Sequence, residues 1–167
     1  MGVLGSIIMP NLQRTTPRYE REEFIARFNA LTQLGWQQAL ASNKAQKISI
    51  DISKRLIFLS SATGEKERSG ELVFKSPIGL NQSTSCELPD QINIKQFFVE
   101  GFDMMAKYTS KKTEEMWFFI VPEGMAQDVI VNFLDTKDTK DDVPRRVGLV
   151  LNPFTAQFKI YDAFQKP

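Results

Sequence analysis

Near the start of the chain, apolar residues recur every three or four positions, the spacing of one face of a helix. The residues that carry this pattern are Phe24, Phe28, Leu31 and Gly35, with Ile25 beside them. Thr16 followed by Pro17 is typical of a helix start, because Thr caps free backbone N–H groups and Pro suits the first helical position. The pattern predicts a helix from residue 17 that either ends at Gly35 or continues to about residue 42.

A different pattern follows, in which apolar and polar residues alternate. In residues 47–53, Ile48, Ile50 and Ile52 face one side, and serine and aspartate face the other. This is the pattern of a half-buried strand. Six more segments have strand character and are joined by polar or turn-rich stretches: residues 55–61, 71–76, 116–122, 128–135, 145–152 and 156–162.

Helical spacing returns in the middle of the chain, at residues 90–108. Its apolar stripe consists of Ile94, Phe97, Phe98, Gly101, Met105 and Tyr108. Asp90 stands where a helix cap is expected, so the segment is predicted to be an amphipathic helix.

The elements in chain order give α-βββ-α-ββββ. Helices grouped apart from runs of strands are typical of the α+β class. The predicted fold has one or more antiparallel sheets of about seven strands, with the helices covering one face. One domain of residues 16–167 is expected, preceded by an apolar arm of residues 1–15.

Composition excludes the commonest catalytic chemistry. The chain of 167 residues has no histidine and a single cysteine, Cys86. Ser-His and Cys-His nucleophile pairs are therefore excluded, as are zinc sites built from His and Cys. We expect no enzyme activity, no cofactor and no metal. The lone cysteine, the lack of a secretory signal and the lack of a 20-residue apolar run together predict a soluble cytoplasmic protein without stable membrane insertion.

The first residues, MGVLGS, fit a myristoylation pattern with Gly2 and Ser6, but two residue types make a weak motif. The alternative interpretation is a docking arm, because exposed apolar residues would promote aggregation. The apolar residues of this predicted interaction arm are Val3, Leu4, Ile7, Ile8 and Met9. We expect the arm to dock on this domain or on another subunit.

Basic and aromatic residues interleave late in the chain, as they do in proteins that bind single-stranded nucleic acid. The candidate residues are Lys107, Lys111, Lys112, Arg145, Arg146, Lys159 and Tyr161. A net charge of +1 gives this alternative only partial support, because nucleic-acid binders usually carry a larger basic excess.

A carboxylate-based metal nuclease is the third hypothesis. Asp135 and Asp138 lie in the acidic segment 135–142, and Asp90 together with the triplet Asp135-Thr136-Lys137 matches the lone aspartate and acidic-x-Lys set of metal nucleases. A charged loop is the simpler interpretation, because no calcium-loop spacing is present. The ranking is therefore a non-catalytic, self-associating protein-interaction and assembly module first, a nucleic-acid binder second and a metal nuclease third. The expected partner is another protein or a second copy.

Overall fold

The computed structural model describes residues 16–111 and 115–167. In these residues two helices, α1 (Pro17–Ser42) and α2 (Met104–Lys111), accompany eleven strands. The strands are β1 (Gln46–Asp51), β2 (Leu56–Lys66), β3 (Leu72–Lys75), β4 (Ser85–Glu87), β5 (Ile92–Val99), β6 (Phe102–Asp103), β7 (Glu115–Val121), β8 (Met125–Ala126), β9 (Val129–Lys140), β10 (Val143–Asn152) and β11 (Gln157–Tyr161).

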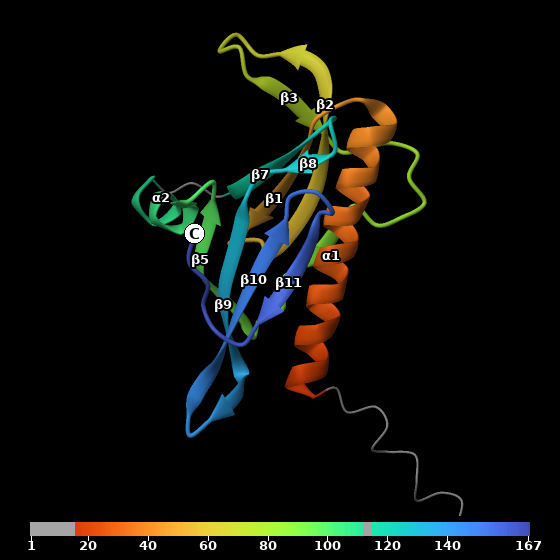
Figure 1. Ribbon diagram of the computed structural model, residues 1–167. Helices are drawn as coiled ribbons and strands as arrows, with labels where there is room; N and C mark the ends of the chain where they lie inside the picture. The colour runs from red at the N-terminus through yellow and green to blue at the C-terminus, as the bar shows by residue number, and fades with distance from the viewer. Residues whose placement is uncertain (1–15, 112–114) are drawn as a thin grey trace, which may run out of the picture.

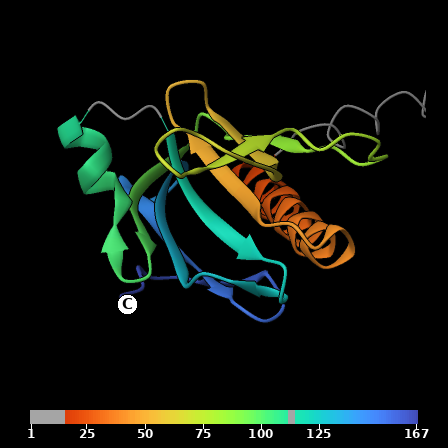
Figure 2. The same ribbon diagram turned by 90° about the horizontal axis from the view of Figure 1, so that it is seen from above.

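The strands form two antiparallel sheets (Figure 1). Sheet A has the order β3-β2-β1-β7-β8, with β4 also paired to β2, and sheet B has the order β11-β10-β9-β5-β6. Helix α1 contacts strands of both sheets, and the view from above shows it beside the opening between them (Figure 2). The long helix thus closes a core that the two sheets share.

The predicted first helix is confirmed, including its start. The Thr16 side chain accepts a hydrogen bond from the backbone N–H of Tyr19 at 3.2 Å, and Pro17 is the first helical residue. Gly35 does not end the helix, which continues to Ser42. A Cβ at Gly35 would lie 3.1 Å from side-chain atoms of Leu59 and Ile120, so this glycine permits close packing of α1 on sheet A.

Aromatic side chains join the layers in the core. The Phe24 ring is stacked on Phe28 at 5.9 Å and meets Phe133 of sheet B edge-on at 6.2 Å. Phe28 also packs against Phe158 at 4.6 Å. Rings of this size dominate core energetics, so the helix face predicted from periodicity is what holds α1 to sheet B.

The predicted second helix over residues 90–108 is wrong. The segment forms β5, a tight turn, β6 and then α2. The buried residues are Ile92, Ile94, Phe97 and Val99, and the pairing of β5 with β9 shifts between Ile94 and Gln96. This bulge inserts one residue, which turns the two-residue period of a strand into a three-residue step that imitates a helix.

The predicted order α-βββ-α-ββββ, with about seven strands, is therefore corrected to eleven strands in two sheets with one long helix. Nor do the helices cover one face, because α1 packs against both sheets. Two segments predicted as loops are largely paired: β2 extends to Lys66, and β9 extends to Lys140. Short edge strands such as β4, β6 and β8 have too few residues to show a period.

Candidate protein-interaction surface

A groove of about 790 Å³ opens on the outer face of sheet A, between the β2–β3 hairpin and strands β1 and β7. We call it the aromatic groove. It is lined by Ala45, Lys47, Glu67, Glu71, Leu72, Val73, Phe74, Trp117, Phe119, Val121 and Gln127. Its volume lies in the range of sites that bind ligands or several side chains of a partner.

Strand alternation explains the aromatic floor. Met116, Phe118 and Ile120 of β7 face the core, so Trp117 and Phe119 face outward and are only half-buried. An outward face of an antiparallel sheet normally carries polar residues in contact with water. Large rings at these positions are therefore unusual, and they make this face of the sheet a candidate for contact with another molecule.

The β2–β3 hairpin folds over this face and forms one wall. The Phe74 ring lies 5.6 Å from Phe119, although β2 and β1 separate their strands in sheet A. The register of β2 and β3 shifts between Ala62 and Lys66, and such an irregularity bends and twists a hairpin. The bend brings Phe74 above the floor.

Lys47 is the positive centre of the groove. Its ammonium lies 5.0 Å from the centroid of the Phe74 ring and 5.5 Å from that of Trp117. Each such cation–π contact contributes roughly 0.5–1 kcal/mol at an exposed site. No ion pair is formed by Lys47 among the described residues, so the ammonium that rests against these two rings is available to a ligand.

The rims of the groove have different chemistry. Glu67 and Glu71 lie at the turn of the β2–β3 hairpin, where the backbone N–H of Glu67 donates to the carbonyl of Glu71 at 2.8 Å. On the opposite side, the amide oxygen of Gln127 accepts the backbone N–H of Phe119 at 2.8 Å. Because Gln127 already takes up this backbone N–H, a ligand cannot pair with the edge of β7 at Phe119. It would contact the face of the sheet instead.

This groove is not among the sites predicted from the sequence. Residues 116–122 were predicted as a strand, and their letters, MWFFIVP, are apolar on both faces of that strand. That is the signal that could have identified Trp117 and Phe119. The contribution of Phe74 depends on the bend of the hairpin, which no local pattern reveals.

A second polar cluster joins α1 to the β9–β10 hairpin. The guanidinium of Arg21 donates to Asp135 at 2.6 Å and to Asp138 at 2.8 Å. Gln91 also donates to the Asp135 carboxylate, at 3.1 and 3.2 Å, and to the carbonyl of Pro17 at 2.9 Å. Asp135 is fully buried, so Arg21 serves as its counter-ion in the interior.

The contacts of this cluster involve the carboxylates that were candidates for a metal site. Asp135 and Asp138 are both bound by the Arg21 guanidinium, whose positive charge lies between them and opposes the binding of a cation there. Asp90 precedes β5, a neighbour of β9, but its carboxylate is exposed and lies 3.5 Å from Arg55. In residues 16–111 and 115–167, no group of three His, Cys, Asp or Glu residues is placed to hold a metal.

The basic residues proposed for nucleic acid do not form one surface. Arg145 is bound to Asp138 at 2.9 Å and to Asp162 at 3.0 Å, which neutralises it. Arg146 lies over the Phe164 ring at 5.5 Å, and Lys159 lies over Tyr161 at 5.2 Å. Lys107 and Lys111 belong to α2, which contacts β5 and β7, whereas β11 forms the far edge of sheet B. Lys112 lies outside the described residues.

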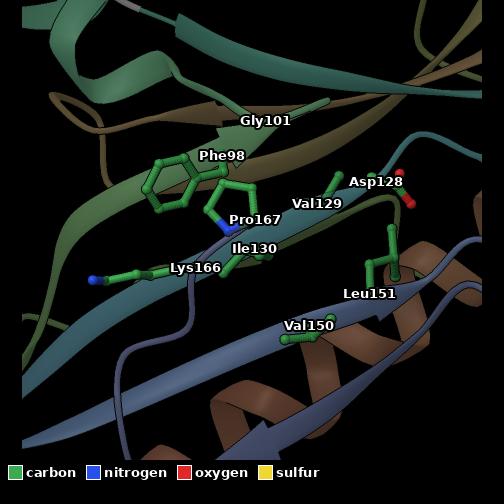
Figure 3. Close-up of a pocket in the computed structure, with 9 residues that line it drawn as sticks. All are labelled: Phe98, Gly101, Asp128, Val129, Ile130, Val150, Leu151, Lys166 and Pro167. Atoms are coloured by element: carbon green, nitrogen blue, oxygen red, sulfur yellow. The ribbon is translucent and has the colours of Figure 1, made fainter.

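Two other hollows lack the features of the aromatic groove. One, of about 870 Å³, lies between α1 and β4 and contains Cys86, whose thiol pKa burial raises to about 11, with Arg27 opposing the shift. That thiol stays protonated near neutral pH and is a poor nucleophile. The other, of about 250 Å³, lies on sheet B beside Pro167 and is walled mainly by Phe98, Val129, Ile130, Val150 and Leu151 (Figure 3).

Gly2, Ser6 and the whole interaction arm (Val3, Leu4, Ile7, Ile8 and Met9) lie outside the described residues, so both predictions about the arm stay open. No helix in the described parts of the chain combines the length and the apolar character that crossing a bilayer requires.

No protein-family model and no curated protein sequence matches the chain. Similar solved structures include two of the minor pseudopilin EpsH from the type 2 secretion system of Vibrio cholerae. One is 10% identical and the other 12%, each with a TM-score of 0.54. Each alignment covers 89% of this chain, and 98% or 99% of the EpsH chain. At this identity the likeness establishes a shared fold, the pseudopilin fold.

The comparison corrects two predictions. EpsH, which shares the fold, comes from a type 2 secretion system, and this finding contradicts the predicted cytoplasmic localisation. A lone cysteine was a weak guide, because a chain without disulfides can fold in a reducing or an oxidising compartment. Nucleic-acid binding is likewise corrected, since neither the fold nor the neutralised Arg145 supports it. What this chain resembles, on the geometry of its long helix and two sheets, is a minor pseudopilin.

Proposed function

We propose that the chain is a non-catalytic assembly module that binds another protein through the aromatic groove. The observation that carries this proposal is Lys47, held between Phe74 and Trp117 on a sheet face where solvated polar residues would be expected. Aromatic residues enriched around a desolvated centre are characteristic of protein interfaces.

The chemistry of the described side chains supports binding over catalysis. The chain has no histidine, its Cys86 thiol is protonated, and Arg21 binds both candidate carboxylates. The groove contains a cation, two rim carboxylates and several rings, but no nucleophile paired with a base. Such a set recognises a partner by charge and apolar contact.

The pseudopilin fold supports the same class of function, because the EpsH structures that share it are of a minor pseudopilin from a type 2 secretion system. Fold alone does not determine function, so the proposal depends on the groove. The self-association predicted from the sequence is part of it. The partner is a protein chain, and nucleic acid is not among the ligands proposed.

Site-specific photo-crosslinking in the cells that make the protein tests this function. A photo-reactive phenylalanine at position 119 should give discrete protein adducts, and Lys47→Glu should abolish them. Phe154 is a matched control, because it is an aromatic residue that is 68% exposed and lies in the turn between β10 and β11. Equal adducts at positions 119 and 154, or none at 119, would overturn the proposal.

A further inference from the structure

We infer that the aromatic groove of one copy receives the tip of the β9–β10 hairpin of a second copy. The hairpin tip consists of Lys140, Asp141, Asp142 and Val143. This inference rests on the proposed function and names the partner of the groove. The contact joins two different surfaces, the groove of one copy and the hairpin tip of the next copy.

The two surfaces lie at opposite ends of the molecule. The hairpin is anchored near the start of α1, where Arg21 binds Asp138. The groove begins at Ala45, three residues beyond the last residue of α1, Ser42. A helix of 26 residues is about 39 Å long, so the surfaces are separated by roughly that length. Figure 1 shows the β9–β10 hairpin projecting at one end and the β2–β3 hairpin at the other.

The hairpin tip is a tight and exposed turn. Lys140 pairs with Val143, which leaves Asp141 and Asp142 as a two-residue loop. Both aspartates have positive φ, 51° and 62°, as a type I′ turn requires. Val143 is 59% exposed, and the three charged residues of the tip have no ion-pair partner among the described residues. A preorganised loop loses little conformational entropy on binding.

The chemistry of the tip complements that of the groove. The Asp141 and Asp142 carboxylates match the unpaired ammonium of Lys47, while the Lys140 ammonium matches the carboxylates of Glu67 and Glu71 at the rim. Val143, the apolar residue of the tip, matches the aromatic floor. Opposite charges facing each other across an interface set its register and exclude wrong partners.

A contact between unlike surfaces leaves each bound copy with one free groove and one free tip. Such a heterologous contact therefore builds open chains or closed rings, whereas a two-fold contact stops at a dimer. A hairpin tip buries little area, so each contact is weak, and assembly depends on concentration. We expect association in the range of about 10 µM to 1 mM.

Sedimentation velocity of the purified full-length chain over that range tests the inference. The wild type should grow beyond a dimer as its concentration rises. Lys47→Glu and the double variant Asp141→Lys/Asp142→Lys should each weaken association by at least about tenfold. Lys95→Glu is the matched control, because it reverses an exposed lysine of sheet B outside the groove and should leave association unchanged.

Combined variants identify the two surfaces. Lys47→Glu/Asp141→Lys/Asp142→Lys in one chain should restore association, because both sides of the contact have exchanged charge. A mixture of Lys47→Ala with Asp141→Ala/Asp142→Ala should stop at a dimer through its one intact contact. Equal melting temperatures show that each variant is folded, and Lys47→Gln replaces Lys47→Glu if that variant is not.

A wild type that stays monomeric at about 1 mM overturns the inference. Association that persists in both charge-reversal variants, as association through the arm of residues 1–15 would, also overturns the inference. Either result would remove self-association through the groove from the proposed function, but not groove binding itself, because adducts at position 119 to a different protein would uphold groove binding while a second copy is excluded.

Discussion

Replacing Arg21 by methionine tests whether the buried ion-pair cluster holds α1 to the β9–β10 hairpin. The Arg21 side chain is 7% exposed and that of Asp135 is fully buried, with 2.6 Å between the guanidinium and the carboxylate. Methionine keeps much of the side-chain length and removes the charge. The Asp135 carboxylate would then remain in the interior without its counter-ion.

The structure sets the size of the effect. Removing one partner of a buried pair costs about 3–5 kcal/mol, because the other charge is left uncompensated. Asp135 would keep the amide of Gln91 and the backbone N–H groups of Lys137 and Asp138, at 3.1 to 3.3 Å. Asp138 would keep Arg145 at 2.9 Å. These remaining donors place the expected cost at the lower end, about 3 kcal/mol, or roughly 6–12 °C in melting temperature for a chain of this size.

Urea and thermal unfolding of the full chain measure this loss. Arg18→Met is the matched control, because Arg18 lies one turn away on the same helix and pairs with Glu22 while 76% exposed. That change should have no measurable effect. Adding Asp135→Asn to Arg21→Met should recover part of the stability, with a coupling of about 1–2 kcal/mol in the double-mutant cycle. Equal losses for Arg21→Met and Arg18→Met, or zero coupling, would refute the reasoning.

Three further changes probe other contacts. Gly148→Ala should destabilise the protein by about 1–3 kcal/mol and expose residues 162–167 to protease, because its Cβ would lie 2.5 Å from the carbonyl oxygen of Ala163. Burial raises the Cys86 pKa from its ordinary 9.0 to about 11. The thiol's contribution to the free energy of unfolding should therefore be fully present below pH 9, and it should be lost between pH 9 and pH 11 by up to about 1.4 kcal/mol per pH unit. Cys86→Ser should abolish this slope in urea titrations at several pH values. Asn29→Ala removes the acceptor of the Phe158 N–H, at 2.7 Å, and should cost about 1–3 kcal/mol in the same assay.

The first helix was predictable because every signal agreed. Thr16, Pro17 and the stripe from Phe24 to Leu31 all favoured one structure, and the helix has that start and that buried face. Residues 90–108 show the opposite case. There, a bulge after Ile94 shifted the buried positions to Phe97 and Val99, and the resulting spacing matched a helix. Periodicity cannot separate the two, because the pairing with β9 that makes the bulge lies more than thirty residues away.

The candidate site was less predictable than the fold for a related reason. Lys47 has no unusual neighbours in sequence, and its significance comes from Phe74 and Trp117, which reach it from two other strands. The arginines that attracted attention in the sequence, such as Arg145, are balanced by acids that are distant along the chain. Clusters of charge in the sequence therefore pointed to a basic surface that the fold neutralises, and they gave no sign of the aromatic groove.

The net charge of +1 shows how far composition can mislead about interactions. It gives nucleic-acid binding only partial support, but a net charge is a sum that hides where each charge lies. Here, Arg21 and Arg145 form ion pairs with carboxylates of the same chain. Among the described residues, Lys47 at one end of the molecule and Asp141 and Asp142 at the other form no ion pair. Lys47 and the two tip aspartates are separated by about the length of α1, so they cannot pair with each other within a single copy. In the proposed contact between successive copies Lys47 meets these aspartates, so a chain of near-zero net charge still has the local charges that end-to-end assembly would use.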